Sequence, residues 1–440
     1  MTKKILSFKG VQYNPDFVTS YADVVTPPYD VISPEMQDEF YARSPYNFCR
    51  IDFPKEEGAV RYEKAGQLYA QWLSEGVLAA DVGPAIYVHH QSFTLPDGRK
   101  VVRKGFLAAR RIESFTEGGI KPHEKTLDGP KADRLNMTRA TKANLSPVFS
   151  LYSDPDRLIE KRLERLVQTT PGVDFVSSDG ERHQVWKLKD PEICDFIDAQ
   201  LSDKPLFIAD GHHRYETALN YRDEIRGQHV KLSEEAAPNS LLMYFSNLND
   251  DGLVILPIHR ALHNLKDFSL DDFIDKLGVY FNVTQASSAN VQAGLAQLEA
   301  EGVANHTFWM ITRDPETAFL LTLNREKWLA SDLAKTLPAP LACLDVTVLH
   351  RLVFEHILGM TEVAQASQEN IIYWKSTQKA MDETRKGHCE LTFLLNPTRI
   401  QDMESVAMAG FKMPQKSTYF FPKIVSGLVM HDVSIEAIDG

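Results

Sequence analysis

The residues best suited to chemistry stand together in one short stretch, Asp210-Gly211-His212-His213-Arg214. Residues 206–208 form an apolar run that predicts a buried strand, and residues 215–222 continue in helical register. Glycine lets the backbone turn sharply or approach a ligand closely. Free N–H groups at the helix start, with two histidines and an arginine, suit an anion. We therefore predict an anion-binding turn, with Asp210 placed to hold a cation or orient a histidine. The alternative is a structural turn that only caps the helix.

A second group of candidate residues lies in a long polar segment, residues 117–145. Within it, His123-Glu124-Lys125-Thr126 brings a base, an acid and a hydroxyl together in a basic part of an acidic protein. Long loops are often active-site lids, so we expect a functional loop here. Glu124 is the first candidate for a general base, and Asp210 is its rival. A solvated surface loop is the alternative.

Two further loops carry candidate residues. In Thr26-Pro27-Pro28-Tyr29-Asp30 the prolines fix φ and exclude a helix, so Tyr29 and Asp30 project from a rigid loop. Lys416 lies near the C-terminus among hydroxyl-bearing, proline and aromatic residues. Two interpretations of this lysine are equally open: it contacts a phosphate, or it is a solvated surface residue.

Composition and charge narrow the class of protein. The chain has 440 residues, 43% of them hydrophobic and 25% charged, which is typical of globular proteins with two or three domains. A net charge of −12 argues against nucleic-acid and anionic-membrane binding. The four cysteines show no metal-ligand spacing, and no apolar run has the length of a signal peptide or a membrane span. We therefore expect a cytoplasmic protein.

The hydrophobic pattern predicts a mixed α/β (α+β) protein in three parts. These are a core with an N-terminal substrate loop (residues 1–266), an inserted small α+β module (267–340) and a C-terminal α/β segment that packs on the core (341–440). Strands are expected at 47–51, 85–94, 100–112, 148–152 and 241–247, and helices at 62–75, 191–200, 270–281 and 346–358.

The turn at residues 210–214 resembles the phosphate-binding turn of the ParB/sulfiredoxin-like superfamily, which includes free serine kinases with a similar Asp-Gly-His-x-Arg turn. Sulfiredoxins carry a nucleophilic cysteine where this chain has His212, so their repair chemistry is not expected. The whole chain resembles the family of domain of unknown function 1015. That resemblance runs through the turn and through residues 26–32, 123–126, 257–260 and 413–418.

The resemblance implies a ParB/sulfiredoxin-like catalytic core and a phosphotransferase acting on the hydroxyl of a small metabolite. The leading reaction is phosphorylation of free L-serine to O-phosphoserine, with pyrophosphate or a nucleotide as donor and Mg²⁺ as cofactor. No Walker-type lysine motif is present, which weakens the case for ATP. The expected partners are the substrate and the donor, without nucleic acid or membrane, and a homo-oligomer is left open. The alternatives are a non-catalytic phosphometabolite sensor and a phosphoserine phosphatase.

The predicted site residues fall into three groups by role. The catalytic residues are Glu124, Asp210 and His212, with Asp210 also the predicted metal ligand; the phosphate-binding residues are Gly211, His213, Arg214, His259, Arg260 and Lys416; the substrate-binding residues are Tyr29, Asp30, His123, Lys125 and Thr126.

Overall fold

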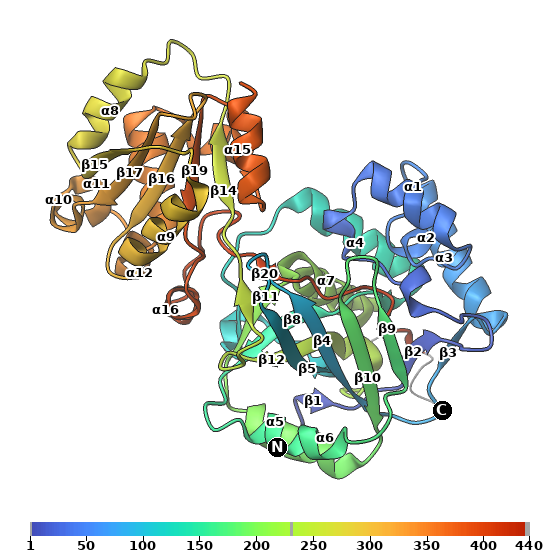
Figure 1. The fold of residues 1–440 in the computed structure, drawn as a ribbon. Helices are drawn as coiled ribbons and strands as arrows, with labels where there is room; N and C mark the ends of the chain where they lie inside the picture. The colour runs from blue at the N-terminus through green and yellow to red at the C-terminus, as the bar shows by residue number, and fades with distance from the viewer. Residues whose placement is uncertain (1, 229–231, 436–440) are drawn as a thin grey trace. The chain divides into compact units, whose positions relative to one another are not determined.

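A computed structural model describes residues 2–228 and 232–435, which form two compact units (Figure 1). The first unit comprises Met1–Pro122, Thr126–Val254 and Pro422–Gly440, and the second comprises His123–Lys125 and Ile255–Phe421. Both combine helices with sheets, which confirms the predicted mixed α/β class. No helix among the described residues is long and apolar enough to cross a membrane.

A mixed sheet of nine strands organises the first unit. Its order is β6-β11-β8-β12-β5-β4-β10-β9, with β1 added beside β5. The β8–β12 and β11–β6 pairs are parallel, and the other pairs are antiparallel. The strands are β1 (Ile5–Leu6), β4 (Ile86–Thr94), β5 (Lys100–Arg111), β6 (Ile120–Lys121), β8 (Val148–Tyr152), β9 (Val173–Val176), β10 (Arg182–Leu188), β11 (Leu206–Asp210) and β12 (Ser240–Asn247).

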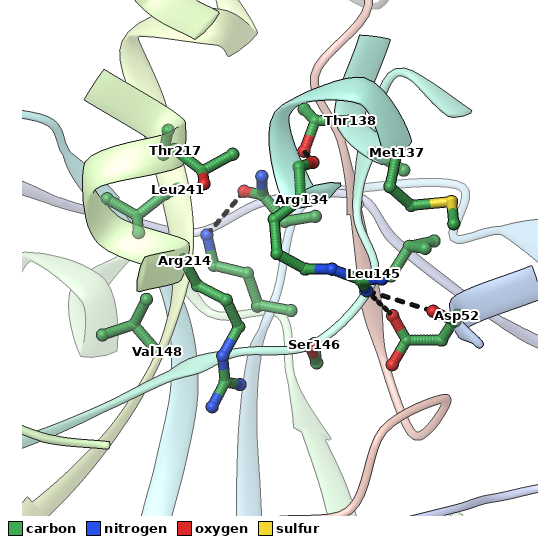
Figure 2. A pocket seen from close by; sticks show the side chains of 14 residues that line it. Asp52, Arg134, Met137, Thr138, Leu145, Ser146, Val148, Arg214, Thr217 and Leu241 are labelled. Carbon is green, nitrogen blue, oxygen red and sulfur yellow. Dashed lines mark hydrogen bonds and ion pairs between the residues drawn. The ribbon is translucent and has the colours of Figure 1, made fainter. Parts of the chain in front are cut away.

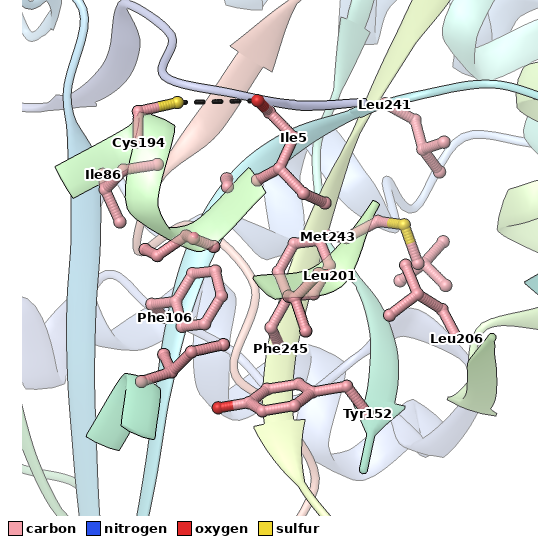
Figure 3. Packing of buried hydrophobic residues seen from close by; sticks show 14 of the residues in the cluster. Ile5, Ile86, Phe106, Tyr152, Cys194, Leu201, Leu206, Leu241, Met243 and Phe245 are labelled. Carbon is pink, nitrogen blue, oxygen red and sulfur yellow. Dashed lines mark hydrogen bonds between the residues drawn. The ribbon is translucent and has the colours of Figure 1, made fainter. Parts of the chain in front are cut away.

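Three helices bury their apolar stripes against this sheet: α5 (Leu158–Leu166), α6 (Pro191–Leu201) and α7 (His212–Gln228). In α6 the buried residues recur at helical spacing, from Ile193 and Cys194 to Ile197 and Leu201. Figure 3 shows side chains of α6 among those of β5, β8 and β12. Each large side chain buried in this way stabilises the fold by about 1.5–3 kcal/mol. The core thus fixes β11 and α7, the two elements on either side of the predicted turn.

A second core of the first unit joins the two ends of the chain. A small sheet has the order β3-β2-β21-β7, so the C-terminal strand pairs with an N-terminal one. Its elements are β2 (Gly10–Tyr13), α1 (Pro34–Arg43), α2 (Cys49–Asp52), α3 (Val60–Ser74), β3 (Leu78–Ala80), α4 (Asp128–Thr141), β7 (Ala143–Asn144) and β21 (Met430–Asp432), with 3₁₀ turns at Tyr21–Asp23, Tyr29–Val31, Phe115–Glu117 and Ala237–Asn239.

Two sequence-based expectations in this region are wrong. The strand expected at 47–51 is instead the short helix α2, which follows a turn in which the Asn47 side chain accepts a hydrogen bond from the Cys49 N–H at 3.0 Å. Residues 117–145 are not one long loop, because α4 occupies Asp128–Thr141. The buried residues Arg134, Met137, Thr138 and Thr141 follow helical spacing, so this segment is anchored and does not form a long lid.

The second unit has its own six-stranded sheet, in the order β15-β17-β16-β19-β14-β18. Trp309, Leu320 and Leu394 from three of its strands share a core with Ala380 and Met381 of α15. Its elements are β14 (His259–Leu262), α8 (Leu270–Gly278), β15 (Phe281–Ala286), α9 (Val291–Gly302), β16 (Thr307–Thr312), β17 (Ala318–Leu323), α10 (Arg325–Ala330), α11 (Asp332–Lys335), α12 (Ala339–Ala342), α13 (Asp345–Thr347), η5 (Val348–Ile357), α14 (Glu362–Ala366), β18 (Ile371–Trp374), α15 (Thr377–Arg385), β19 (Leu391–Leu395), α16 (Ile400–Met408) and β20 (Phe420–Phe421), while β13 (Val254–Ile255) spans the boundary between the units.

The segment expected as a separate module, residues 267–340, supplies three strands to this larger sheet. Its strand β16 pairs with β19, which lies in the expected C-terminal segment, and β14 of the expected core also belongs to the sheet. A separate 267–340 module stays a prediction. The helix expected at 346–358 is present as the π-helix η5 over Val348–Ile357.

A candidate phosphate-binding turn

The predicted turn joins β11 to α7 as the sequence indicates. Asp210 ends the strand and His212 begins a helix of 17 residues. Gly211 between them has φ +90°, a conformation that residues with a side chain rarely adopt. A Cβ atom at this position would lie 2.8 Å from Nε of Arg214. Glycine is therefore required both for the backbone conformation and for the close approach of the arginine.

Two cations converge on the carboxylate of Asp210. Nη2 of Arg214 donates to Oδ2 at 2.6 Å, and Nζ of Lys423 donates to Oδ1. The second guanidinium nitrogen, Nη1, donates to the carbonyl oxygen of Pro147. Burial acts to lower the pKa of Lys423, but the negative charges of Asp210 and Asp30 outweigh it, so the pKa is raised. Lys423 therefore stays a cation at neutral pH.

The positions of the two histidines in the turn differ from those of histidines that bind phosphate simply through a positive charge. His212 is buried at the first position of α7. Nε2 of His213 accepts a hydrogen bond from the Leu127 N–H at 2.9 Å, so the proton of the neutral ring is on Nδ1. Burial lowers the pKa of His213, which agrees with a neutral ring. His213 thus offers a hydrogen-bond donor and not a positive charge.

Thr126 fixes the segment that leads into α4. Its hydroxyl donates to Oε2 of Glu216 on α7 at 2.7 Å, and Lys131 of α4 lies 3.3 Å from the same oxygen. These contacts hold the start of α4 against α7, so Thr126 has a positioning role in this structure.

The rigid loop before α1 packs on α4 through Tyr29. The guanidinium of Arg134 lies 3.8 Å from the centre of the Tyr29 ring, a cation–π contact. Burial raises the pKa of Tyr29 to about 12, so it is a neutral phenol at physiological pH. Asp30, by contrast, is exposed, and among the described residues it forms no hydrogen bond or ion pair. The loop is thus anchored by its tyrosine and presents its aspartate to solvent.

Arg134 also forms a buried ion pair. Its Nη1 donates to Oδ1 of Asp52 at 2.8 Å, and both side chains are at least 95% buried. Burial raises the pKa of Asp52 against the opposing effect of Arg134 and Arg214. In Figure 2 Arg134 points toward Asp52, whereas Arg214 points away from that pair. Removal of one partner of such a pair typically costs several kcal/mol, so Arg134 and Asp52 are structural.

The cavity beside these groups is small. It has a volume of about 40 Å³ and is lined by Arg214, Arg134 and Asp52 together with Ser146 and Thr217 (Figure 2). This volume is enough for a few water molecules and far below the 300–1,000 Å³ of typical metabolite sites. The cavity therefore suits water or a single polar group next to Arg214.

The other members of the predicted His-Glu-Lys-Thr motif belong to the second unit. His123 is buried there, with Nε2 3.0 Å from the hydroxyl oxygen of Thr418 and its carbonyl accepting from the Met413 N–H. Glu124 forms a single β-bridge with Met413 and is half-buried, whereas Lys125 is exposed. The motif at 413–418 thus holds the motif at 123–126 by backbone and side-chain contacts.

His259, Arg260 and Lys416 are also in the second unit. Nε2 of His259 contacts the Thr377 hydroxyl at 2.9 Å, and Nδ1 accepts from the Leu395 N–H at 3.3 Å. Burial lowers the pKa of His259 to about 3. Arg260 is buried and donates to the carbonyl oxygens of Ile258 and Lys416, while the Lys416 side chain is exposed. His259 and Arg260 therefore have mainly internal contacts, and only Lys416 presents its charge to solvent.

The predicted magnesium ligand does not fit a metal in this structure. Both oxygens of Asp210 accept from cations, which compete with a metal ion for the same lone pairs. Among the described residues, no group of three or more histidine, cysteine, aspartate and glutamate side chains is arranged to hold a metal. We derive no catalytic step through a metal at Asp210.

Lys423, one of the two cations on Asp210, belongs to the basic C-terminal group with Lys412 and Lys416, for which the sequence leaves a phosphate contact and solvated surface equally open, and it is not among the predicted site residues. A signal was present, because this lysine lies in the apolar context Phe420-Phe421-Pro422-Lys423-Ile424-Val425, where a solvated lysine is not expected. Asp52 gave no comparable signal, because its pairing with Arg134 depends on the packing of α2 against α3 and α4.

Comparison with known proteins identifies the family. A family model described as "Protein of unknown function (DUF1015)" matches residues 5–347. The chain belongs to this family. The match covers all of the predicted motifs except the one at residues 413–418. No curated protein matches the chain.

Several solved structures are distantly similar to this one. A conserved hypothetical protein from Pyrococcus furiosus has 15% identity and a TM-score of 0.33, over 72% of this chain and 93% of that one. A free serine kinase in complex with AMP has 14% identity and a TM-score of 0.33, over 72% and 90%. SbnI from Staphylococcus aureus, with a C-terminal truncation, has 9% identity and a TM-score of 0.36, over 76% and 90%. Likeness at this level carries no argument about function.

Proposed function

We propose that the protein is a phosphotransferase that acts on the hydroxyl of a small metabolite, with free L-serine as the acceptor and O-phosphoserine as the product. The observation that carries the proposal is the convergence of Arg214 and Lys423 on Asp210 beside the start of α7. Phosphate oxygens suit the same charge-assisted donors, and the N–H groups at a helix start add to the attraction. Asp210 balances these cations when no phosphate is bound.

The chemistry that such a site supports is mainly positioning and neutralisation of charge. The acceptor oxygen forms a bond to phosphorus while the bond from phosphorus to the donor oxygen breaks. Arg214 and Lys423 stabilise the negative charge, and a carboxylate takes the proton of the acceptor hydroxyl. We propose Glu124 as this base, as the sequence predicts, because the paired oxygens of Asp210 are poor proton acceptors. His212 stays a catalytic candidate, and Mg²⁺ stays a prediction, since the described part of the chain places no three metal-ligating side chains together.

A non-catalytic phosphometabolite sensor is the second candidate. It is favoured by the pairing of both Asp210 oxygens, because a sensor needs the cations of the turn but no free base. Pyrophosphate and nucleotides are the donors proposed for the transferase, and phosphorylated metabolites are the ligands proposed for the sensor.

The two functions are separated by a transfer assay with purified protein and Mg²⁺. Each acceptor, L-serine or a related hydroxy compound, is incubated in turn with pyrophosphate, ADP and ATP as donors. O-phosphoserine is then quantified by mass spectrometry. We expect at least one donor to yield O-phosphoserine, with loss of product in Arg214→Ala and normal turnover in Arg139→Ala, which removes an exposed arginine of α4. Absence of product with every donor, together with retained pyrophosphate binding, would support the sensor. Release of phosphate from O-phosphoserine alone would indicate a phosphatase.

A further inference from the structure

A second cavity, of about 360 Å³, lies wholly within residues of the second unit. Its walls come from the residues around α12, from η5 and α14, from β18 and from residues 412–415. Its volume falls within the range of small-molecule binding sites. Leu337, Leu341 and Met413 give it apolar walls, and Lys125 and Lys412 add basic ones.

One wall of this cavity is the π-helix η5 (Val348–Ile357), which contributes His350, Arg351 and Glu355. π-Helices are rare, occur mostly as single turns, and are frequent at functional sites. A π-helical run of 10 residues is therefore unusual, and here it forms the wall of a cavity.

His350 leaves a hydrogen-bond acceptor without a partner in this wall. Nδ1 lies 2.8 Å from Oε1 of Gln365, an oxygen that only accepts, so the ring proton is on Nδ1. The Gln365 amide is held in this orientation because its Nε2 donates to the carbonyl oxygen of Met360. The His350 side chain is 93% buried. Its opposite ring nitrogen, Nε2, is buried as well and has no hydrogen-bond partner among the described residues. A buried acceptor without a partner is costly, and a ligand donor would satisfy it once a small shift of the wall opens Nε2, which has almost no accessible surface here, to the cavity.

The electrostatic environment of the cavity favours an anion. Arg260 is buried under Tyr373, which lines the cavity, with its guanidinium 5.5 Å from the ring centre. The hydrogen-bond acceptors of Arg260 among the described residues are main-chain carbonyls, and burial lowers its pKa to about 10, so it keeps its charge. The acidic residues of the wall, Glu355 and Glu362, each lie 2.6 Å from Arg351. The negative charges of these two glutamates are therefore compensated by Arg351. Lys125 and Arg260, in contrast, have no acidic partner among the described residues.

We propose that this cavity binds an amphipathic organic anion. Its apolar body lies against Leu337, Leu341 and Met413, its anionic group lies near Lys125 and Lys412, and a hydroxyl or N–H group donates to Nε2 of His350. The proposal does not depend on phosphate binding at residues 210–214, which belong to the first unit.

The test uses the full chain and the fluorescent dye toluidinonaphthalenesulfonate, which combines an aromatic body, an N–H donor and a sulfonate. We expect one dye molecule to bind per chain. Leu341→Trp, which fills the cavity, should abolish binding. His350→Phe, which keeps a ring but removes the acceptor, should weaken it roughly 3- to 10-fold, as expected for one hydrogen bond. Val363→Asp is the control, because Val363 is 77% exposed and lies outside the cavity wall.

Circular dichroism and thermal melting identify variants that have lost their fold. If Leu341→Trp fails to fold, the decision rests on His350→Phe and on Lys125→Glu, which should weaken dye binding by adding a negative charge to the wall. Equal dye affinity in wild type, His350→Phe and Lys125→Glu would overturn the proposal. Absence of dye binding to the wild-type chain would also overturn it.

Discussion

At Asp210 an acidic side chain lies between two basic ones, and each of its oxygens accepts from a different cation. This pairing explains how Arg214 and Lys423 are held close together without a bound anion. It also means that a phosphate must displace or share the aspartate to reach them. The proposed affinity for phosphate is therefore the difference between two charge-assisted interactions, which is smaller than either alone.

The proposed base is tested at the residue scale by Glu124→Gln. Glutamine keeps the size and hydrogen bonding of glutamate but does not accept a proton at neutral pH. A general base typically contributes about 10²- to 10⁴-fold, so turnover should fall by that factor while donor affinity, measured by calorimetry, changes little.

The matched variant is Asp30→Asn, which removes the exposed carboxylate of the first unit's rigid loop. We expect it to raise the KM for the acceptor, as a substrate contact should, with turnover reduced less than in Glu124→Gln. A large loss of turnover in Asp30→Asn with normal turnover in Glu124→Gln would assign the base to Asp30 instead.

At the scale of elements, the turn between β11 and α7 depends on Gly211. Gly211→Ala places a side chain at φ +90° and a Cβ close to Arg214. We expect a loss of about 1–2 kcal/mol in the free energy of unfolding, measured by urea denaturation, because the left-handed conformation is unfavourable for alanine. Pyrophosphate binding should also weaken, because Arg214 must move.

Gly129→Ala serves as the control for this substitution. Gly129 lies in the first turn of α4 without positive φ, and a Cβ there would meet no atom within 4 Å. Alanine is the better helix former, so this variant should be neutral or slightly more stable, with unchanged pyrophosphate affinity. An equal loss of stability in both variants would contradict the special role of Gly211.

Local sequence signals predicted those elements whose stabilising contacts are also local. The hairpin β4–β5, the strand β11 and the helix α6 follow from hydrophobic periodicity and from turn or capping residues close in sequence. The strand predicted at 47–51 is wrong because the Asn47 side chain accepts from the Cys49 N–H two residues on, a local turn contact that competes with an extended strand. The pairing of β21 with β2 and the contact of Lys423 with Asp210 join residues hundreds of positions apart. Nothing in the local pattern of either segment specifies such a partner.

At the scale of the whole molecule, buried neutral histidines should make the protein sensitive to acid. Burial lowers the pKa of His259 and His350 to about 3 and that of His431 to about 4. Below pH 6.5 the unfolded chain binds protons at these residues while the folded chain does not. Stability should therefore fall as the pH decreases from 6.5 toward 4, by about 1.4 kcal/mol per pH unit for each histidine.

Urea denaturation between pH 7.5 and pH 4.5 measures this dependence. In the variant His431→Gln the slope should be lower by the contribution of one histidine, because glutamine does not titrate, while its amide can still contact the Ser240 hydroxyl. An unchanged slope in this variant would show that His431 is accessible to protons in the folded protein.

The claim on which the proposed function depends is that Arg214 binds phosphate, and isothermal titration calorimetry with pyrophosphate tests it most directly. The wild-type chain is compared with Arg214→Ala and with Arg139→Ala, whose arginine forms an exposed ion pair with Glu224. One charge-assisted contact is worth about 1.5–3 kcal/mol, and the contact with Asp210 that Arg214 gives up offsets part of it, so Arg214→Ala should bind pyrophosphate more weakly by up to roughly 150-fold, with Arg139→Ala unchanged. Equal affinity in wild type and a folded Arg214→Ala would contradict the phosphate-binding turn.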